Sequence, residues 1–340
     1  MDSAGQDFAK KCGCKGIRTC LLCEGERTTV KASQGNAEGK VRYTYCNQCH
    51  KAWHHIKGSL YQTEEMDFPG VLVLEDFITQ EEEADIVTVI EGAEWKMSQS
   101  GRKKQDFGPK VNFKKKKLKL GGFTGLPNFS ASLLDRMKSH DLLKDFTPVE
   151  QCHLDYDPSR GSAIDPHFDD FWLWGERLVT VNLLADSVLT MSCEEKGKVE
   201  VTIQQTSNCE HGKKPVARTS STLDYEVLVP SNKRSSQSTA VTVVDPQDMT
   251  GSQDMLIESN SLRYCDAEVA IPMPRRSLLV VYGDARHKWM HAIHREDITG
   301  RRIAVTLREL SSEFSADGVH SQTGKELIEV ALSFGGSAIS

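Results

Sequence analysis

The pattern of apolar and polar positions predicts a chain built mainly of short strands. The run FPGVLVLEDFIT (68–79) is apolar and nearly continuous, which is typical of a buried strand that ends in a turn. Strand patterns return in RLVTVNLLADSVLTM (177–191), AEVAIPMPRRSLLVVYG (267–283) and RRIAVTLREL (301–310). Many short strands with few helices indicate a β-sandwich or a jelly roll.

Two helices are predicted near the beginning and the end of this strand-rich region. In TQEEEADIVTVIEG (79–92), Thr79 is the expected N-cap, and Glu82 stands three residues later, which is the spacing of a capping box. The segment GKELIEVALSF (324–334) has the pattern of a short amphipathic helix. The apolar side of the first helix is expected to consist of Ile86, Val87, Val89 and Ile90.

Composition divides the chain into two predicted units. Residues 1–67 are cysteine-rich and lack a periodic apolar pattern, whereas residues 68–340 carry the strands. A polar insertion, rich in Ser, Thr, Gln and Asp, is predicted at about residues 192–260. The expected fold is therefore α+β and mainly β: a double-stranded β-helix (jelly-roll) core with flanking helices and a small cysteine-rich N-terminal module.

Charge and terminal sequence indicate a soluble intracellular protein. The formal net charge of -6 argues against a protein that is basic all over, although it allows a local basic patch. The N-terminus lacks the apolar core of a signal peptide, and no apolar run is long enough to span a bilayer. We therefore expect no membrane association and a location in the cytoplasm and nucleus. Thiols stay reduced there, so the 10 cysteines are better candidates for metal ligands than for disulfides.

The stretch GSAIDPHFDDFWLWGE (161–176) contains a pair of residues that could bind a metal ion. Residues i and i+2 of a strand point to the same side, so His167 and Asp169 could share one divalent metal ion. A second histidine would complete a two-histidine, one-carboxylate facial triad. The alternative is an ordinary polar pair at a strand end. The segment GDARHKWMHAIH (283–294) follows a strand and offers three candidates for the distal ligand: His287, His291 and His294.

Two arginines share one face of the predicted strand at 301–310. Arg302 and Arg308 alternate with the apolar residues Ile303, Val305 and Leu307. Two arginines that face inward need anionic partners, and a dicarboxylate cosubstrate would supply two carboxylates. The alternative is a solvent-facing strand whose arginines pair with neighbouring acids.

Together these motifs resemble the AlkB family of Fe(II)- and 2-oxoglutarate-dependent dioxygenases, whose pattern is H-x-D, a distant H, then R-x-N-x-T-x-R. The resemblance extends to EQCHLDYDPSRGSAIDPHFDD (150–170) and to SQSGRKKQDFGPKVNF (98–113), and it covers residues 68–340 apart from the insertion. Within the family, CGCKGIRTCLLCE (12–24) and DPHFDDFWLWGERLV (165–179) are similar to the branch formed by the fourth AlkB homologue of animals.

The resemblance implies a role for each matching residue. It implies that 2-oxoglutarate is held at its distal carboxylate by Tyr156 and Arg302, and that Arg308 lies near its metal-chelating end. The implied iron ligands are His167, Asp169 and His291.

The sequence departs from the family pattern at two places in the implied cosubstrate pocket. Ala304 stands where the family has an asparagine between the two arginines. The asparagine expected before Tyr156 is also absent, and that neighbourhood contains His153, Leu154 and Asp155. One or two polar contacts to the cosubstrate are therefore expected to be missing.

The resemblance also implies a reaction and a substrate. The reaction is oxidative N-demethylation with O2 as the oxidant: 2-oxoglutarate is decarboxylated to succinate and carbon dioxide, an N-methyl group is hydroxylated, and the product loses formaldehyde. The implied substrate is methyl-lysine of a protein such as actin, with N6-methyladenine in DNA as a rival. The acidic overall charge favours a protein, although residues 98–122 are basic. A third hypothesis is a catalytically weak binding or scaffold protein.

The N-terminal cysteines form a second candidate metal site. The spacing C-x-C-x5-C-x2-C of Cys12, Cys14, Cys20 and Cys23 suits tetrahedral zinc. Further candidate ligands are Cys46, Cys49 and His50, and iron–sulfur ligation also stays open. The alternative is a tail with free thiols.

Two further groups are candidates for the substrate side. The lysine run Lys114, Lys115, Lys116 and Lys117 could contact phosphates, dock an acidic protein surface or act as a nuclear-import signal, and the alternative is a solvated hairpin. Trp172 and Trp174 share a face if their stretch is extended. They could line a substrate groove or pack in the core or at its edge.

Overall fold

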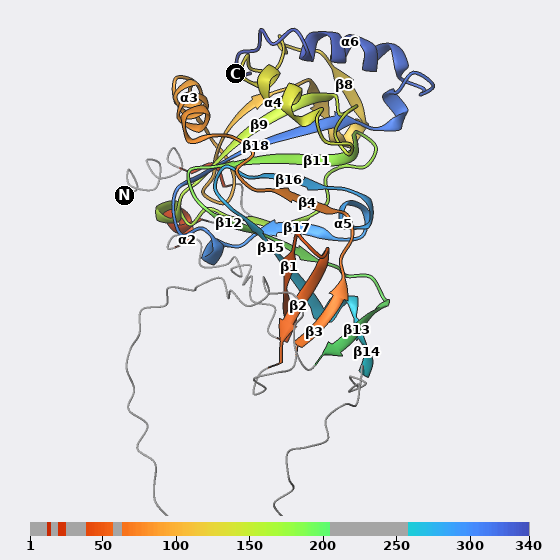
Figure 1. Ribbon diagram of the computed structural model, residues 1–340. Helices are drawn as coiled ribbons and strands as arrows, with labels where there is room; N and C mark the ends of the chain where they lie inside the picture. Colours follow the sequence, from red (N-terminus) through yellow and green to blue (C-terminus); the bar gives the residue numbers. More distant parts are fainter. Residues whose placement is uncertain (1–11, 15–19, 25–38, 57–62, 205–257, 340) are drawn as a thin grey trace, which may run out of the picture.

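The computed structural model describes residues 12–14, 20–24, 39–56, 63–204 and 258–339. Two large β-sheets and one two-stranded hairpin account for the strands of these residues (Figure 1). No helix in the described part of the chain is long and apolar enough to cross a membrane.

The first sheet has seven strands. In spatial order they are β4 (Val71–Leu74), β16 (Leu278–Val281), β11 (Trp174–Leu183), β18 (Arg302–Leu310), β9 (Pro148–Tyr156), β6 (Lys103–Phe107) and β5 (Lys96–Met97).

The second sheet has nine strands. In spatial order they are β10 (Ile164–His167), β17 (Met290–Ile293), β12 (Ser187–Ser192), β15 (Ala267–Met273), β1 (Val41–Cys46), β2 (Lys51–His55), β3 (Thr63–Asp67), β13 (Lys198–Gln204) and β14 (Glu258–Arg263). A separate hairpin consists of β7 (Lys110–Asn112) and β8 (Lys117–Lys119).

The chain alternates between the two large sheets, which is the topology of a double-stranded β-helix. Strands β9, β11, β16 and β18 belong to the first sheet, whereas β10, β12, β15 and β17 belong to the second. In chain order, β9 and β10 lie in different sheets, as do β11 and β12, β15 and β16, and β17 and β18. The predicted jelly-roll core, in a fold that is mainly β, is therefore confirmed.

Helices and short helical turns surround the strands. The longer helices are α3 (Gln80–Glu91), α4 (Ser130–Met137) and α6 (Ser321–Ala331), and α4 and α6 lie over the first sheet at the top of Figure 1. The shorter elements are α2 (Leu21–Glu24), α5 (Gly283–His287), η1 (Phe113–Lys115), η2 (Pro158–Arg160), η4 (Tyr264–Asp266), η5 (Arg295–Asp297) and η6 (Ser312–Phe314).

The predicted capping box at the start of α3 is confirmed. The Glu82 amide donates to Oγ1 of Thr79 at 3.2 Å, and the Thr79 amide donates to Oε2 of Glu82 at 2.8 Å. Ile86 and Ile90 are buried as expected, but Val89 is 57% exposed. The prediction for Val89 was wrong because only one stripe of α3 faces the sheet.

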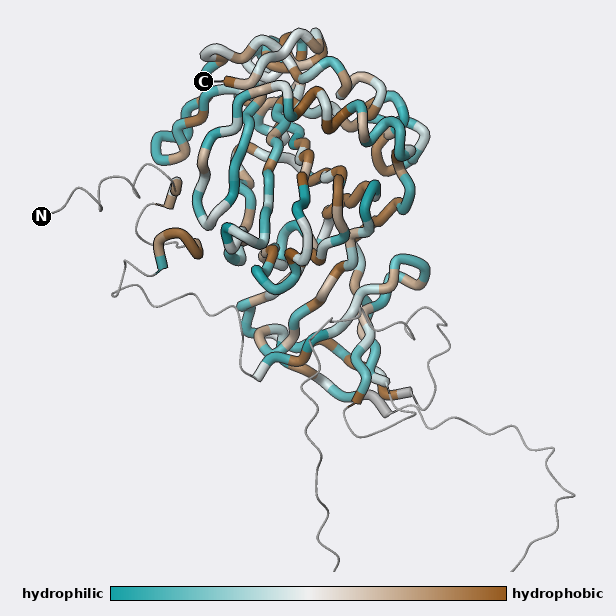
Figure 2. The backbone as a smooth tube through the Cα atoms, turned by 90° about the vertical axis from the view of Figure 1, so that its left-hand side faces the viewer, coloured by the Kyte–Doolittle hydropathy of each residue, from teal (hydrophilic) through white to brown (hydrophobic). Residues whose placement is uncertain are grey.

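Two hydrophobic cores hold the layers together, and hydrophobic stretches gather in the central strands and in the helices above them (Figure 2). The first core packs the longer helices on the outer face of the first sheet, for example Met137 of α4 with Val305 of β18. The second core lies between the sheets and joins Ala304 of β18 with Met191 of β12 and Ile271 of β15. Because side chains alternate along β18, one strand contributes to both cores.

The N-terminal region contains more regular structure than its sequence pattern indicated. Strands β1 to β3 extend the second sheet, and β1 pairs in parallel with β15, with Val41 opposite Ala267. Tyr43, Tyr45 and Met66 join the core between the sheets. The predicted boundary at residue 68 stays a prediction, but β1, β2 and β3 share a sheet and a core with strands that follow residue 68.

Part of the predicted polar insertion is also ordered as strands. β13 and β14 pair antiparallel at the edge of the second sheet, where β13 also pairs with β3. Residues 205–257, which make up most of the predicted insertion, lie outside the described residues.

Candidate active site

Three predicted metal ligands meet where β10 and β17 run side by side. His167, the last residue of β10, is the direct partner of His291 in the ladder with β17, and the two ring centroids are 4.3 Å apart. Asp169 follows two residues later, beyond the end of β10. The candidate ligand atoms of these three side chains all lie within 4.8 Å of one another. The pairing of two short strands thus brings together residues that are more than a hundred positions apart.

The structure distinguishes among the three distal histidines that the sequence offered. His287 ends α5 and is exposed, and its Nε2 lies 2.9 Å from Oε2 of Glu176. Nε2 of His294 lies 3.8 Å from Oε1 of Glu268. Only His291 joins the group formed with His167 and Asp169 in the described residues.

The charge state of this group suits a divalent cation. Burial lowers the pKa of His167, and burial together with the neighbouring His167 ring lowers the pKa of His291 to about 3. Burial opposes ionisation of Asp169, but Arg308 and the two histidines hold the pKa of this carboxyl well below its usual range. Two neutral imidazoles and one carboxylate are the deprotonated donors that a facial-triad iron site requires.

A mainly apolar cavity opens beside the group, between the two sheets. Its polar lining includes Tyr156, Thr180, Arg302, Thr306 and Arg308, and its apolar walls include Leu189, Met273 and Ile293. The alternation predicted for β18 is confirmed here, because Arg302, Ala304, Thr306 and Arg308 all line this cavity.

Arg302 is a buried cation with an incomplete set of partners. Its side chain is 2% exposed, its Nε donates to Oδ1 of Asn182 at 2.5 Å, and its guanidinium carbon lies 5.0 Å from the ring centroid of Tyr156. No described residue hydrogen-bonds its buried Nη1, and burial lowers its pKa. An unpaired buried guanidinium is costly, so this edge of the cavity fits a carboxylate of a bound dicarboxylate.

Arg308 already has two carboxylate partners. Its Nε donates to Oδ2 of Asp169 at 2.7 Å, and its Nη1 donates to Oε2 of Glu150 at 2.6 Å. Burial opposes the charge of Arg308, but the two carboxylates outweigh it and raise the pKa. Arg308 therefore orients a candidate metal ligand, and it also lines the cavity beside the three candidate ligands.

The two departures from the family pattern face each other. Leu154 of β9 is the ladder partner of Ala304 of β18, and both line the cavity. The other ladder partner of Ala304 is Asn182 of β11, whose side chain accepts from Arg302. Asn182 was missed in the sequence, although an asparagine within the apolar run LVTVNLL was a usable signal for a polar site.

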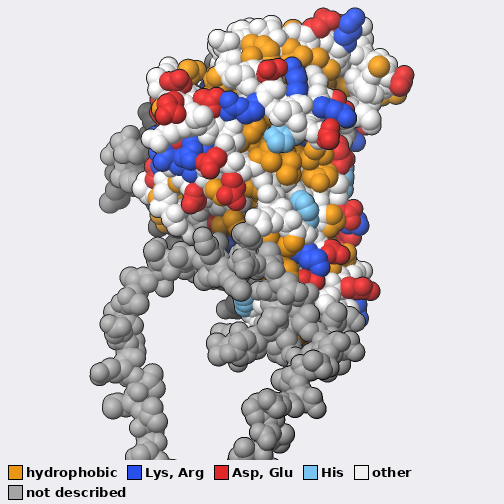
Figure 3. Space-filling view, viewed as in Figure 1, with side chains coloured by type: hydrophobic (Ala, Val, Ile, Leu, Met, Phe, Trp, Pro, Cys, Tyr) orange, Lys and Arg blue, Asp and Glu red, His pale blue; other side chains and the backbone are white. Residues whose placement is uncertain are grey.

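An aromatic rim, defined as Phe168, Phe171 and His287, lies next to the candidate metal ligands. Phe168 is 40% exposed and Phe171 is 45% exposed, and their ring centroids are 5.4 Å apart. His287 lies 5.4 Å from Phe171, and the guanidinium carbon of buried Arg286 lies 4.6 Å from the same ring. Apolar side chains and a histidine gather on the face that carries α5 (Figure 3). The sequence analysis selected Trp172 and Trp174 as substrate-side candidates and missed Phe168 and Phe171.

The two tryptophans pack in the core rather than in the cavity. Trp174 is 5% exposed within the first core, and Trp172 packs at the edge of that core, 6.3 Å from Phe314 between ring centroids. Neither lines the cavity. The packing alternative describes both residues, because burial of a large indole stabilises the core.

The lysine run forms an exposed hairpin, as one of its alternatives predicted. Strand β6 leads into it through Gly108, where an added Cβ would lie 2.8 Å from Cγ of Glu150, the partner of Arg308. The hairpin is therefore attached beside the candidate site. Its exposed lysines are Lys114, Lys115, Lys116 and Lys117.

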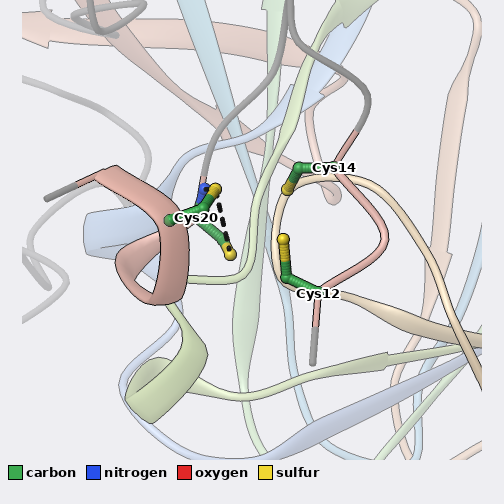
Figure 4. Close-up of side chains that lie close together, drawn as sticks. Cys12, Cys14 and Cys20 are labelled. Carbon is green, nitrogen blue, oxygen red and sulfur yellow. Dashed lines mark hydrogen bonds between the residues drawn. The ribbon is translucent and has the colours of Figure 1, made fainter. Parts of the chain in front are cut away.

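Four N-terminal cysteines come together, and we call them the cysteine cluster: Cys12, Cys14, Cys20 and Cys23. Their sulfur atoms all lie within 4.8 Å of one another, and the side chains of Cys12, Cys14 and Cys20 point toward one another in Figure 4. Cys46, Cys49 and His50, the other candidates, are not part of this group. Burial raises the pKa of the Cys14 and Cys20 thiols, so their thiolates would need a cation nearby.

Fold and site together define a class of protein. A double-stranded β-helix, with a His–Asp–His group beside a cavity lined by an arginine whose Nη1 has no partner among the described residues, is the arrangement of non-haem Fe(II) and 2-oxoglutarate-dependent oxygenases.

Comparisons with known proteins assign the chain within this class. Alpha-ketoglutarate-dependent dioxygenase alkB homolog 4 of Homo sapiens is 44% identical over 340 residues, 98% of this chain and 97% of that protein. The Mus musculus protein of the same name is 44% identical over 338 residues, 99% of both chains. The chain belongs to the AlkB family of alpha-ketoglutarate-dependent dioxygenases and is therefore an enzyme. The scaffold hypothesis is not supported.

Other comparisons are weaker. A Caenorhabditis elegans protein named DNA N6-methyl adenine demethylase is 29% identical over 347 residues, 94% of both chains. A solved structure titled "The structure of OsALKBH1" covers 71% of this chain at 10% identity, with a TM-score of 0.38. No protein-family model matches the sequence.

The distal ligand can be tested with two histidine variants. We expect His291→Ala to abolish iron binding and turnover, because it removes one of three donors, and His287→Ala to retain Fe(II) binding, because His287 faces Glu176 at the surface. Anaerobic equilibrium dialysis with Fe(II) measures both, and thermal unfolding checks the fold. Iron binding lost in His287→Ala and retained in His291→Ala would reverse the assignment.

The cavity arginine can be tested by a change that keeps the charge. Arg302→Lys loses the planar fork, and we expect 2-oxoglutarate to bind roughly 10-fold to 100-fold more weakly, on the order of 1.4–3 kcal/mol. Calorimetric titration with Mn(II) in place of iron measures this binding without turnover. Arg301→Lys is the matched control, because Arg301 faces Asp155 and Glu91 instead. Equal affinities in the two variants would exclude Arg302 from the cosubstrate site.

Proposed function

We propose that this dioxygenase is an N-demethylase that acts on methyl-lysine of a protein, such as actin, and releases formaldehyde. One observation carries the reaction type: the His–Asp–His group shares a cavity with Arg302, a buried cation whose Nη1 has no partner among the described residues. Such a cavity fits a metal ion and a dicarboxylate side by side.

In this proposal, five residues that line the cavity bind the metal ion and the cosubstrate. Ferrous iron would be held by His167, Asp169 and His291, and with 2-oxoglutarate it would supply the oxidising chemistry of this enzyme class. Arg302 would bind the distal carboxylate of 2-oxoglutarate, helped by the hydroxyl of Tyr156. The fit is supported by the donor types and by the unpaired guanidinium edge.

The surrounding residues would hold the ligands and keep water out. Arg308 keeps Asp169 ionised and fixes its orientation through two hydrogen bonds. The apolar walls formed by residues such as Leu189 and Ile293 exclude water from the reacting atoms. Positioning of the methyl group and exclusion of water are the main contributions that a protein makes to this type of chemistry.

The aromatic rim supports a cationic substrate. Phe168 and Phe171 expose their rings directly beside the candidate iron ligands, and the exposed Asp170 lies between them in sequence. A methylated lysine is a cation with apolar methyl groups, which aromatic faces and a nearby carboxylate attract. The similarity to alkB homolog 4 along nearly the whole chain is consistent with this choice.

N6-methyladenine in DNA is the second candidate. The exposed lysines of the β7–β8 hairpin could contact phosphates, and a relative at 29% identity carries the name of a DNA N6-methyl adenine demethylase. The same aromatic rim could also stack on a base.

We also propose a structural zinc ion in the cysteine cluster. With Zn–S bonds of about 2.3 Å, tetrahedral geometry places the sulfur atoms about 3.8 Å apart. The sulfur atoms of Cys20 and Cys23 are 3.7 Å apart, and three of the four cysteines are buried.

The substrate can be tested by measuring formaldehyde release from three substrates in parallel: an intact methylated actin, a methyl-lysine peptide and an N6-methyladenine oligonucleotide. We expect the protein to be the best substrate. DNA binding should be weak and should depend on salt with a slope of roughly -3.6 on duplex if all four hairpin lysines contact phosphates. Efficient turnover of the oligonucleotide at physiological salt, lost when these lysines are changed to Gln, would favour the DNA candidate.

The aromatic rim can be tested at Phe171. Phe171→Leu keeps apolar area but loses the ring, and we expect kcat/KM on the methyl-lysine peptide to fall about 5-fold to 30-fold, for a cation–π contribution of ~1–2 kcal/mol. Phe171→Tyr keeps the ring and should retain most of the activity. If Phe171→Leu is as active as the wild type on the peptide, the rim does not recognise the methylated cation.

A further inference from the structure

The cysteine cluster joins two short pieces of chain that have little core of their own. Residues 12–14 and 20–24 contribute a small apolar group formed by the cluster itself and Leu22. Segments this short do not bury enough surface to fold independently, so a bound metal ion would supply the energy that orders them. The part of the molecule that such an ion would stabilise therefore depends on which residues 12–14 and 20–24 contact.

The first contact is with the β5–β6 turn, residues 98–102. Gly13 packs so closely on this turn that an added Cβ would lie 2.6 Å from the backbone oxygen of Ser98. A Cβ added at Gly101 would lie 3.2 Å from Cβ of Cys20. The turn and the cluster therefore meet backbone to backbone, where no side chain could fit between them.

The β5–β6 turn is hydrogen-bonded to the loop between β9 and β10. Oγ of Ser162 donates to the backbone oxygen of Gly101 at 2.7 Å, and Nε of Arg160 donates to the same oxygen at 2.8 Å. This loop connects Tyr156, which lines the cavity, with the strand that ends at His167. Its position decides where both site residues lie.

Residues 20–24, which carry two of the cluster cysteines, contact the segment after β17. Glu24, the last residue of α2, forms a two-pronged ion pair with Arg295, at 2.6 and 3.2 Å. Arg295 follows His291 by four residues. A Cβ added at Gly161 would lie 2.6 Å from Cγ of Leu21 and 3.1 Å from Nε of Arg295. The β9–β10 loop at Gly161 therefore packs tightly on Leu21 of α2 and on the segment after β17.

The β5–β6 turn also carries a residue that faces the cavity wall. Arg102 is 6% exposed, and its guanidinium carbon lies 5.9 Å from the ring centroid of Tyr156. The ring of Tyr156 therefore lies near two guanidiniums, that of Arg102 from the β5–β6 turn and that of Arg302 from β18.

We infer that the metal ion of the cysteine cluster is a clamp on the active site, which holds the loops that lead into and out of the iron-ligand strands. The inference rests on the proposed iron and 2-oxoglutarate site and deepens it. Helix α2, which carries Cys23, contacts the loop before β10 through Leu21 and the segment after β17 through Glu24. Loss of the ion would loosen both histidines together.

The clamp is tested by removing the ion and measuring the other site. The full-length Cys12→Ser/Cys23→Ser variant is compared with Cys265→Ser, a cysteine outside the cluster. Elemental analysis should show zinc falling from about one per chain to near zero in the double variant alone. Calorimetric titration of 2-oxoglutarate in the presence of Mn(II) should show about 10-fold or weaker binding, as for other residues that orient ligands indirectly.

Two variants that keep all four cysteines separate transmission from folding. Ser162→Ala breaks the link from the turn to the β9–β10 loop, and Glu24→Gln breaks the charge pair with Arg295. Both should keep zinc and still weaken 2-oxoglutarate binding several-fold. Asp266→Asn, which breaks an ion pair with Arg263 at the edge of the second sheet, should leave both measurements unchanged.

The outcomes distinguish the clamp from the proposed function. Wild-type affinity in the zinc-free double variant would overturn the clamp and leave the iron site as proposed. If the double variant does not fold, wild-type affinity in both Ser162→Ala and Glu24→Gln would overturn it instead. Absence of Mn(II)-dependent 2-oxoglutarate binding in the wild-type protein would overturn the proposed function and the clamp with it.

Discussion

The partly buried guanidinium of Arg308, which binds two carboxylates, is the group on which the site depends. It donates to Asp169, which follows β10 of one sheet, and to Glu150 of β9 in the other sheet. A partly buried charge is stabilised by such partners, and removing one of them would leave the other charge incompletely compensated. The same bonds keep Asp169 ionised and aimed at the two histidines. The contact that joins the sheets is therefore also the one that prepares the metal site.

The two arginines of β18 both line the cavity, but they differ in their partners. Arg308 binds two carboxylates, whereas the contacts of Arg302 with described residues are to neutral groups: Asn182, Met273 and the ring of Tyr156. The departure at Ala304 removes a polar group from the wall next to Arg302, and its ladder partner on β9 is also apolar. A cavity with fewer polar groups has a lower effective dielectric, which strengthens an ion pair between guanidinium and a bound carboxylate. Arg302 and its neutral neighbours can thus make up for the lost contacts.

The sequence predicted what depends on local spacing and missed what depends on long-range pairing. The capping box at Thr79 and the alternation along β18 follow from residues within a few positions of one another, and both are present in the structure. The choice of His291 over its neighbours needs the register of β10 against β17, which spacing alone does not determine. Asn182 becomes a site residue only because β11 pairs with β18, and residues 41–46 become a strand because β15, more than two hundred residues away, offers an edge.

The two candidate metal sites illustrate the same contrast within one molecule. The cysteine cluster is encoded by short spacings, so its ligands are recognisable in sequence, but its place in the molecule is set by close backbone contacts at Gly13 and Gly101. The histidine site has ligands that no short motif unites, and the sheet places them. Because the loop at 157–163 touches the cluster side and ends in the strand of His167, the locally encoded site lies against the one that depends on the whole fold. A metal ion in the cysteine cluster, as we propose it, would thereby support strands whose own pairing is short: β10 and β17 have four residues each.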